Sequence, residues 1–417
     1  MKVLWLARVW PEPGSSAAGY RTAQLLSALA ARGHDVEVCS PCRDNEHRQH
    51  LAGEGITTVT FQPNDSAFDA YVKQLGPNLV IFDRFMTEEQ FAWRVREQCP
   101  EAIRVLDTID LHSLRRTRQE MVKSGRNPLV LNPSDLHSAD WLRELSAIFR
   151  SDCSLIISDA ELELLQTRCH VQAQLLRLCR MHYTVAKETP AFDERRHFVV
   201  IGNFHHEPNT DSYRILQETL WAKIRTALKC RGERGAELHI YGAYPTKHFM
   251  QLDNERAGFR VKGWVDNTAE TLQHYRVNLA PLRFGAGIKG KIAEGWSLGT
   301  PCVATSIAAE GMHEQLPFGG VVADDWDEFA EHAADLYLDC AKWETAKAEG
   351  RHIIETLFGD VENVSRIVEF LEDVAPLREA RVSNFVGSML WHHQHRSTEF
   401  FSRWIEAKGA ANASAVE

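Results

Sequence analysis

The sequence contains no long apolar segment. No run approaches the roughly 20 apolar residues that a helix needs to span a bilayer. At the N-terminus, MKVLWLARVWPEPG has a short apolar run that Arg8 interrupts, so it lacks the hydrophobic region of a signal peptide and is expected to form a buried strand. We therefore expect a cytoplasmic protein, with contact at the inner face of the membrane left open.

The chain also lacks an excess of positive charge. It has 47 Lys and Arg against 57 Asp and Glu, a formal net charge of −10. This balance argues against general nucleic-acid binding, although a local basic cleft inside an acidic shell stays compatible with it. The nine cysteines are scattered and odd in number. They indicate reduced thiols rather than a disulfide framework.

Several cofactor motifs are missing as well. Gly14 and Gly19 have the spacing of a Walker A loop, but Tyr20 stands where its lysine is needed. There is no G-x-G-x-x-G fingerprint and no Asp-x-Asp pair placed for a metal. The ligand types in Cys39-x2-Cys42 and in His47 and His50 suit zinc, but the two pairs are closer in sequence than known zinc sites allow. We expect no metal and no cofactor.

The chain does contain a regular alternation of strands and helices. Short apolar runs rich in β-branched residues alternate with helix-length amphipathic segments, which is typical of βαβ units and parallel sheets. The sequence therefore predicts an α/β fold in two halves that join near residue 190, with helices after Asp325. The predicted strands are 2–9, 35–40, 57–61, 78–83, 103–108 and 154–159, followed by 197–203, 237–242, 259–264, 277–282, 301–306 and 319–324.

The densest stretch is PLRFGAGIKGKIAEGWSLGTPCVATS, residues 281–306. A predicted strand ends there in a glycine-rich loop, and ligands of open parallel sheets bind beyond the carboxyl ends of the strands. Glycines, Lys289, Lys291 and a helix N-terminus suit a phosphate or diphosphate. Glu294, one turn further on, could accept two hydrogen bonds from a ribose diol. The alternative is a Lys291–Glu294 surface pair beside glycines that only turn the chain.

The same stretch resembles the donor-binding motif of retaining GT-B glycosyltransferases, the family 4-like members of glycosyl transferases group 1. That family carries a Glu-x7-Glu element across this loop and helix. Glu294 matches its second glutamate, which holds the donor ribose, whereas Ala286 stands in place of the first. The resemblance implies a nucleotide-sugar site in this segment, formed by Gly285, Ala286, Gly287, Ile288, Lys289, Lys291 and Glu294.

The resemblance extends to other segments. FVVIGNFHHEPNTDSYRIL is similar to the first strand and loop of the donor domain, with Gly202 and Asn203 at the strand end. Gly263, Trp264 and Val265 fall where the family contacts the base, although a tryptophan at a strand end also packs without binding. The residues expected on the acceptor side are Ser15, Ser16, Gly19 and Arg21.

IRVLDTIDLHSLRRTR resembles a family loop whose histidine lies near the reacting sugar. The residues expected to be catalytic are Lys289, His112 and Asp110. Several of the expected site residues also have a simpler interpretation. His112 is then a polar surface residue, Ser15 and Ser16 cap the helix, and Arg21 is a solvated residue of the first turn.

Together the resemblance implies a GT-B fold with two Rossmann-like domains facing across a cleft: residues 1–190 on the acceptor side and 191–370 for the donor. A helical extension, 371–417, is expected to pack back on the first domain. The implied activity is metal-independent, retaining hexosyl-type transfer from a UDP- or GDP-type sugar to a glycan, lipid-linked or small-molecule acceptor. Two alternatives are a non-catalytic nucleotide-sugar-binding scaffold and a nucleotide-sugar epimerase.

Overall fold

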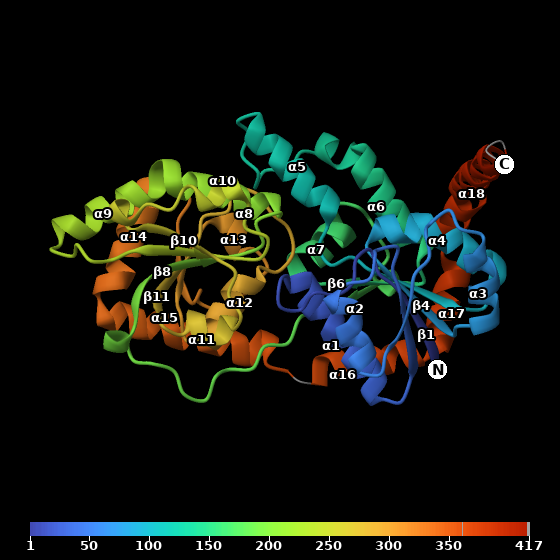
Figure 1. Ribbon diagram of the computed structural model, residues 1–417, viewed down its shortest axis with the longest axis horizontal. Coiled ribbons are helices and arrows are strands. Elements are labelled where there is room, and N and C mark those ends of the chain that lie inside the picture. Colours follow the sequence, from blue (N-terminus) through green and yellow to red (C-terminus); the bar gives the residue numbers. More distant parts are fainter. Residues whose placement is uncertain (361, 415–417) are drawn as a thin grey trace.

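The computed structural model describes residues 1–360 and 362–414 and contains two parallel sheets. Their strand orders are β3-β2-β1-β4-β5-β6-β7 and β10-β9-β8-β11-β12-β13. Each sheet has helices on both faces and forms a domain of its own, and the two domains lie side by side (Figure 1). The α/β prediction is therefore confirmed.

The first sheet and its helices come from the N-terminal half of the chain. Its strands are β1 (Lys2–Leu6), β2 (Asp35–Cys39), β3 (Thr57–Val59), β4 (Leu79–Asp83), β5 (Ile103–Asp107), β6 (Cys153–Ile156) and β7 (Leu176–Leu178). Its helices are α1 (Ala17–Ala31), α2 (Glu46–Gly53), α3 (Ala67–Leu75), α4 (Phe85–Gln98), α5 (His112–Lys123), η1 (Pro133–His137), α6 (Ala139–Arg150), α7 (Asp159–Thr167) and η2 (Ala173–Leu175).

The second sheet follows after a connecting segment. Its strands are β8 (Arg196–Ile201), β9 (Leu238–Tyr241), β10 (Phe259–Gly263), β11 (Tyr275–Ala280), β12 (Cys302–Ala304) and β13 (Gly320–Val322). Its helices are η3 (Phe192–Glu194), α8 (Glu207–Ile215), η4 (Leu216–Leu220), α9 (Trp221–Cys230), α10 (Lys247–Met250), η5 (Glu255–Ala257), α11 (Thr268–Leu272), α12 (Gly290–Ser297), α13 (Ser306–Ala309), α14 (Trp326–Leu338), α15 (Cys340–Ile353) and η6 (Ile354–Phe358).

Each of the twelve predicted strands overlaps a strand of the structure, and β7 is the one that the prediction missed. The central strands β4 and β5 are buried along their whole length, because helices cover both faces of the sheet. These two strands end in register, with Asp83 opposite Asp107. Their carboxyl ends therefore bring polar residues together at one edge.

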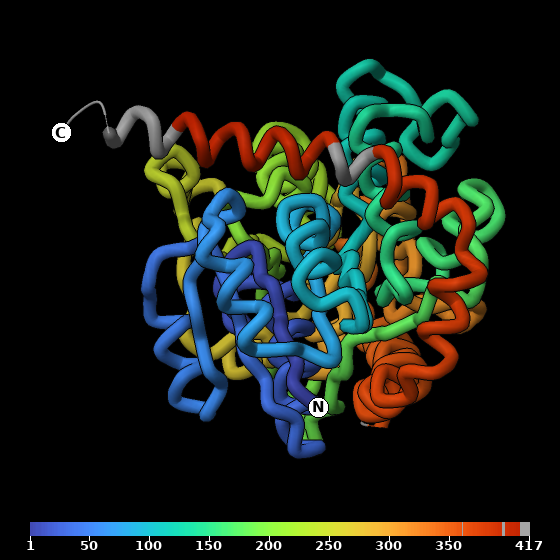
Figure 2. The backbone as a smooth tube through the Cα atoms, turned by 90° about the vertical axis from the view of Figure 1, so that its right-hand side faces the viewer, coloured from blue at the N-terminus to red at the C-terminus, as the bar shows by residue number. Residues whose placement is uncertain are grey.

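The chain returns to the first domain through its C-terminal helices, α16 (Glu362–Glu372), α17 (Val374–Ser383) and α18 (Phe385–Ser414). Helix α16 packs against α1, α17 against β5, and α18 against α6 and α4. Figure 2 shows α18 as a long helix across the surface of the first domain. The predicted boundary at residue 371 placed most of α16 in the second domain, whereas the chain returns to the first domain already with α16. Residues 415–417 of the predicted extension lie outside the described residues. No helix among the described residues is both long and apolar enough to cross a membrane.

Arg21 on α1 is a buried structural residue, 1% exposed. Its guanidinium pairs with the Asp107 carboxylate at 2.8 Å and donates to the carbonyl oxygen of Cys179. Burial alone would lower the pKa of Arg21, but the charge of Asp107 outweighs it and raises that pKa. The expectation that Arg21 meets an acceptor or solvates the first turn is wrong, because its side chain points into the core and ties α1 to the ends of β5 and β7.

We expect Arg21→Met to lower the free energy of unfolding by roughly 3–5 kcal/mol, because it leaves the Asp107 carboxylate buried without its cation. Urea unfolding followed by circular dichroism measures the loss. Arg32→Gln is the matched control, since Arg32 lies on the surface at the end of the same helix and pairs with exposed Glu369 and half-buried Glu372. A midpoint for Arg21→Met equal to that of the control would contradict the structural role.

Candidate functional site

The glycine-rich loop follows β11 at the carboxyl edge of the second sheet and leads into α12. Lys289 occupies the N-cap of α12 without any side-chain hydrogen bond to the first turn. The Ile292 N–H donates to the Lys289 carbonyl oxygen at 2.8 Å. The N–H groups of Gly290 and Lys291, together with the helix dipole, are therefore the ones available to an anion. This is the position that the sequence predicted for the loop.

The loop also reaches the first domain at close range. Gly287 has a positive φ of 64°, and a Cβ added there would lie 2.8 Å from the Cβ of Asp110. A Cβ at Gly290 would lie 2.9 Å from both the Cβ of Ala17 and the hydroxyl of Tyr183. Glycine is needed at both positions because any side chain would push the two domains apart.

Arg118 of α5 fastens the loop from the first domain. Its guanidinium donates to the carbonyl oxygen of Gly285 at 3.0 Å and pairs with Glu310 at 2.6 Å. Ala286 is half-buried and packs against the apolar core of the first domain. The position where the family places a carboxylate is therefore an apolar contact between the domains in this chain.

The two lysines of the loop are held in different ways. Lys289 is 4% exposed, and its ammonium donates to the carbonyl oxygens of Gly287 at 2.9 Å and Glu310 at 3.3 Å. The Lys291 ammonium donates to the Asn209 side chain at 2.6 Å. Burial lowers the pKa of each lysine to about 8. Both remain mostly charged at neutral pH.

Glu294 lies one turn into α12, and its carboxylate has no hydrogen-bond or ion-pair partner within residues 1–360 and 362–414. Burial raises its pKa to about 7. Its charge also contributes to the raised pKa of Tyr20 and Tyr183, after the burial of those two hydroxyls. The predicted Lys291–Glu294 surface pair does not form, so the carboxylate is free to accept hydrogen bonds from a ligand.

The loop after β8 lies next to Lys291. A Cβ at Gly202 would lie 2.4 Å from the Asn209 side chain, which donates to the carbonyl oxygen of Asn203 at 3.1 Å. Gly202 and Asn203 thus position Asn209, and Asn209 in turn positions Lys291. Asn209 was not among the predicted site residues, although it lies in the segment that resembles the first strand and loop of the donor domain.

The predicted base-contact residues lie at the end of β10. Gly263 has a positive φ of 75°. Trp264 is 51% exposed. Its ring lies near Gly14 of the first domain, since a Cβ added at Gly14 would be 3.9 Å from the ring. Its indole N–H donates to Asp266 at 2.8 Å. Val265 packs on the small core cluster beside β8. A core role for Trp264 is excluded, whereas a base contact stays a prediction.

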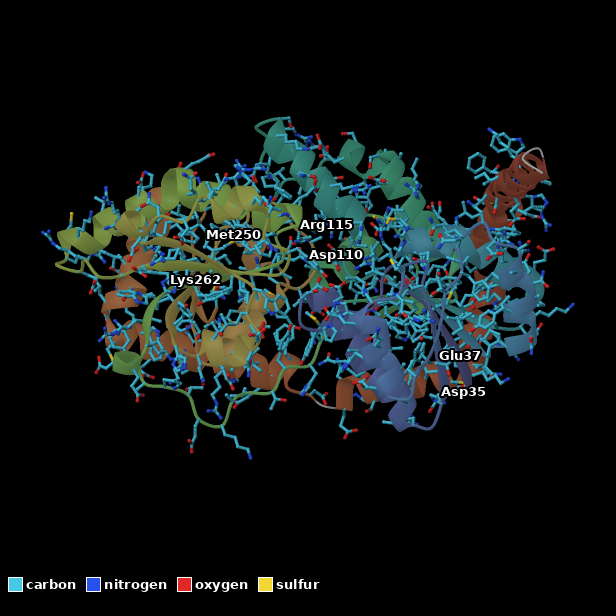
Figure 3. The ribbon with its side chains drawn as sticks, viewed as in Figure 1. Asp35, Glu37, Asp110, Arg115, Met250 and Lys262 are labelled. Carbon is cyan, nitrogen blue, oxygen red and sulfur yellow. The ribbon has the colours of Figure 1, made fainter. Side chains whose placement is uncertain are left out.

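Asp110 and His112 lie beside the glycine-rich loop. The Nε2 of His112 lies 3.3 Å from Asp110, whose other oxygen accepts from Arg115 (Figure 3). Burial, followed by the charges of Arg84, Arg116 and Arg8, lowers the pKa of His112 well below its usual value. His112 is therefore neutral at pH 7 and is not a simple surface histidine.

The loop before α1 is shaped by hydrogen bonds within the loop. Ser16 caps α1 by accepting from the Gly19 N–H at 3.0 Å, as one reading of the sequence predicted. Ser15 donates to the Glu12 carboxylate at 2.6 Å, and Tyr244 of the second domain donates to the same oxygen at 2.9 Å. A Cβ at Gly19 would lie 2.3 Å from the Glu12 carbonyl oxygen. Glu12 and Tyr244, which the sequence did not single out, join the two domains here.

One group of described side chains has the types and proximity that a metal requires: His197, Glu237 and His239. It lies at the amino ends of β8 and β9, at the edge of the sheet opposite the loop. The Nδ1 of His197 accepts the Glu237 N–H at 3.1 Å, which places the ring proton on Nε2 in the neutral tautomer. The Nε2 of His239 lies 2.8 Å from the Glu237 carboxylate, so two of the three side chains already contact each other.

Comparisons with known proteins agree with this architecture. Residues 195–339 match a family model described as Glycosyl transferases group 1. A sucrose-phosphate synthase from Thermosynechococcus elongatus has 16% identity and a TM-score of 0.65, covering 89% of this chain and 98% of its own. Alr3699/HepE from Anabaena in complex with UDP has 14% identity and a TM-score of 0.66, covering 89% and 100%. No sequence among curated proteins matches the chain.

A glycosyltransferase from Rickettsia africae, at 10% identity, has a TM-score of 0.62 and covers 91% of this chain and 98% of its own. At such low identities these likenesses show the fold alone. The fold is GT-B, as the resemblance of the sequence predicted.

Two glycines of one loop give a matched test of the contact between the domains. We expect Gly287→Ala to lower the free energy of unfolding by roughly 1–3 kcal/mol, because its φ is left-handed and its Cβ meets Asp110. At Gly285 an added Cβ would make only ordinary contacts, the nearest at 3.8 Å. Gly285→Ala should therefore be close to neutral in urea unfolding, and equal losses for the two variants would contradict the close approach.

Proposed function

We propose that the protein is a retaining glycosyltransferase that moves a sugar from a UDP- or GDP-type nucleotide sugar to an acceptor hydroxyl without a metal. The observation that carries this proposal is the arrangement around α12. Lys291 and a free helix N-terminus lie on one side, and the unpartnered carboxylate of Glu294 lies one turn away. This pairing suits a diphosphate followed by a ribose diol.

Three groups are assigned roles in donor binding. The α12 N–H groups and Lys291 would meet the diphosphate, while the ribose hydroxyls donate to Glu294. Asn209 keeps the Lys291 ammonium in place, because its own amide is fixed by the loop after β8. UDP bound to Alr3699/HepE, a protein of the same fold, supports a nucleotide ligand.

The reaction breaks the bond between the sugar C1 and the diphosphate oxygen, and it forms a bond between C1 and the acceptor oxygen. The acceptor hydroxyl passes its proton to the departing diphosphate when both lie on the same face of the sugar, which retains the configuration. Negative charge grows on the leaving group in the transition state. Lys289, Lys291 and the α12 dipole stabilise that charge more than they stabilise the ground state.

We assign to Asp110 and His112 a contact with the sugar from the first domain. His112 is neutral and Asp110 is partly engaged by Arg115, so these side chains act as hydrogen-bond partners rather than as a charged acid–base pair. We assign the protein to a reducing compartment, the cytoplasm, because its nine cysteines are free thiols.

Ala286 favours one alternative, a nucleotide-sugar-binding scaffold without catalysis, because the expected carboxylate is missing there. Incubation with a panel of UDP- and GDP-sugars distinguishes the two functions. Release of free UDP or GDP, or transfer to an added acceptor, supports the transferase. Binding of a nucleotide sugar without release or transfer supports the scaffold, and conversion of the sugar while it stays attached to the nucleotide indicates an epimerase.

Two substitutions separate the proposed roles. We expect Glu294→Gln to weaken donor binding by roughly 10- to 100-fold, because the amide carries no charge and keeps only one of the two acceptor oxygens. Lys289→Ala should lower turnover by roughly 100- to 1,000-fold with a smaller change in donor affinity. Calorimetry measures the first effect and product formation the second.

Lys262→Ala is the matched control, since Lys262 is an exposed lysine of β10. Transfer rates at the wild-type level in both site variants would show that the site is misplaced.

Donor affinity should depend on pH in a defined window. Glu294, with a pKa of about 7, ionises as pH rises, so affinity increases by up to about eightfold between pH 6 and 7.5. Above about 8 the two lysines lose their protons, and affinity falls again. Calorimetry with a nucleotide sugar, whose phosphates do not titrate in this range, measures both limbs. The rising limb should disappear in Glu294→Gln, and its persistence would assign it to another group.

A further inference from the structure

Four arginines gather where the central strands of the first sheet end. Arg8 follows β1, Arg84 follows β4, and Arg115 and Arg116 lie in the first turn of α5, which follows β5. Strands β1, β4 and β5 are neighbours in the sheet, so their carboxyl ends bring these residues to one edge. We call these four residues the arginine cluster.

Contacts between the segments that carry the cluster confirm that they are adjacent. The Arg8 guanidinium lies 2.6 Å from the sulfur of Met86, two residues after Arg84. The ring of Phe85 meets the ring of His112 edge-on, with 6.1 Å between centroids. The start of α4 therefore lies between Arg8 and the start of α5.

The charges of the cluster act on one another. After burial, Arg84 makes the next largest contribution to the lowered pKa of Arg8 and of Arg115, which falls to about 10. Desolvation by surrounding atoms, followed by Arg115, Lys291 and Arg84, lowers the pKa of His206 to about 3. His206 belongs to the loop after β8 in the second domain, so the cluster lies close to that loop across the domain boundary.

The carboxylates nearby do not balance the cluster. Asp83 accepts from the Arg84 side chain and from the Arg8 backbone N–H, both at 3.1 Å. Asp110 pairs with Arg115, and Asp140 pairs with Arg116 at 2.6 Å. In the part of the chain that the structure describes, no carboxylate pairs with the Arg8 guanidinium, although that side chain is exposed. Glu144 and Glu161 also act on Arg115, but burial raises the pKa of each to about 7, so they carry only part of a negative charge at neutral pH.

The backbone at this edge is strained. Arg84 and Ile109, which are not glycines, have φ values of 71° and 64°. The N–H of Arg84 is held by the carbonyl oxygen of Asp107 at 2.8 Å. Such conformations cost roughly 1–3 kcal/mol each and gather at functional sites.

We propose that the arginine cluster binds a phosphate group carried by the acceptor. Guanidinium groups match phosphate oxygens with paired hydrogen bonds, and a dianionic phosphate with three free oxygens can meet several of them, whereas a carboxylate offers two. The donor diphosphate has its own cations on α12. This inference rests on the proposed function, because it assigns the second substrate of the same reaction to phosphorylated compounds or phospholipid headgroups.

The test measures binding of stated probes by calorimetry, with and without saturating UDP or GDP. The probes are inorganic phosphate, glycerol 3-phosphate, glycerol and acetate, together with phosphatidylcholine vesicles with and without phosphatidic acid. We expect the phosphate probes, or the vesicles with phosphatidic acid, to bind at least tenfold more tightly than their neutral counterparts and than acetate. Binding of the soluble phosphate probes indicates a soluble acceptor, and binding of the phosphatidic acid vesicles indicates a lipid.

The variant Arg8→Gln/Arg84→Gln should lose at least tenfold in phosphate affinity while nucleotide binding stays unchanged. Arg8→Gln alone changes only an exposed side chain. It serves as the test if the double variant does not fold. Arg234→Gln is the matched control, because Arg234 is exposed in the loop before β9, at the opposite edge of the second sheet.

Three outcomes would overturn the inference: no preference for phosphate over the neutral probes, equal binding of acetate, or a parallel loss of nucleotide affinity in the cluster variants. The last would assign the cluster to the donor. Failure of the proposed function is seen separately, as the absence of nucleotide binding or of turnover of every nucleotide sugar in the wild type.

Discussion

The close approach of the loop 285–290 to the first domain is the constraint on which the rest of the site depends. Gly287 and Gly290 allow backbone to meet Asp110 and Ala17 at distances that no side chain permits. Because the loop is pressed against the first domain, residues from both sheets surround the start of α12. The same contact accounts for Ala286: a glutamate there would place a carboxylate against apolar side chains, where burial is costly.

The two domains carry different kinds of positive charge on the two sides of this contact. Lysines and a helix dipole lie on the second domain, and arginines lie on the first. The lysine ammonium is a compact charge on a flexible side chain, which suits the growing charge of a leaving group. The planar arginine guanidinium donates paired hydrogen bonds that hold a bound oxyanion in one orientation. Arg118, which joins Gly285 to Glu310, belongs to neither group, since its charge is used to hold the domains together.

The twelve strands could be predicted from their apolar runs, because parallel strands that are buried on both faces have continuous hydrophobic sequences. β7 was missed because Arg177 interrupts it and only Leu176 is buried, so no continuous apolar run marks it. The burial of Arg21 had a signal: it shares a helix face with Leu25 and Leu29, at steps of four. Asn209 and the arginine cluster could not be predicted, because they depend on which strands are neighbours and on contacts between residues far apart in sequence. The glycines, lysines and Glu294 were visible because one loop and one helix turn carry them.

The C-terminal helices have a consequence for how the chain is made. Val368 and Leu371 of α16 belong to the same core cluster as Val3 and Leu25, so the first domain is built from both ends of the polypeptide. During synthesis the second sheet emerges complete while the first still lacks the helices that cover α1 and β5. The second domain can therefore close first, and the first domain keeps an apolar face uncovered until α16 to α18 have been synthesised.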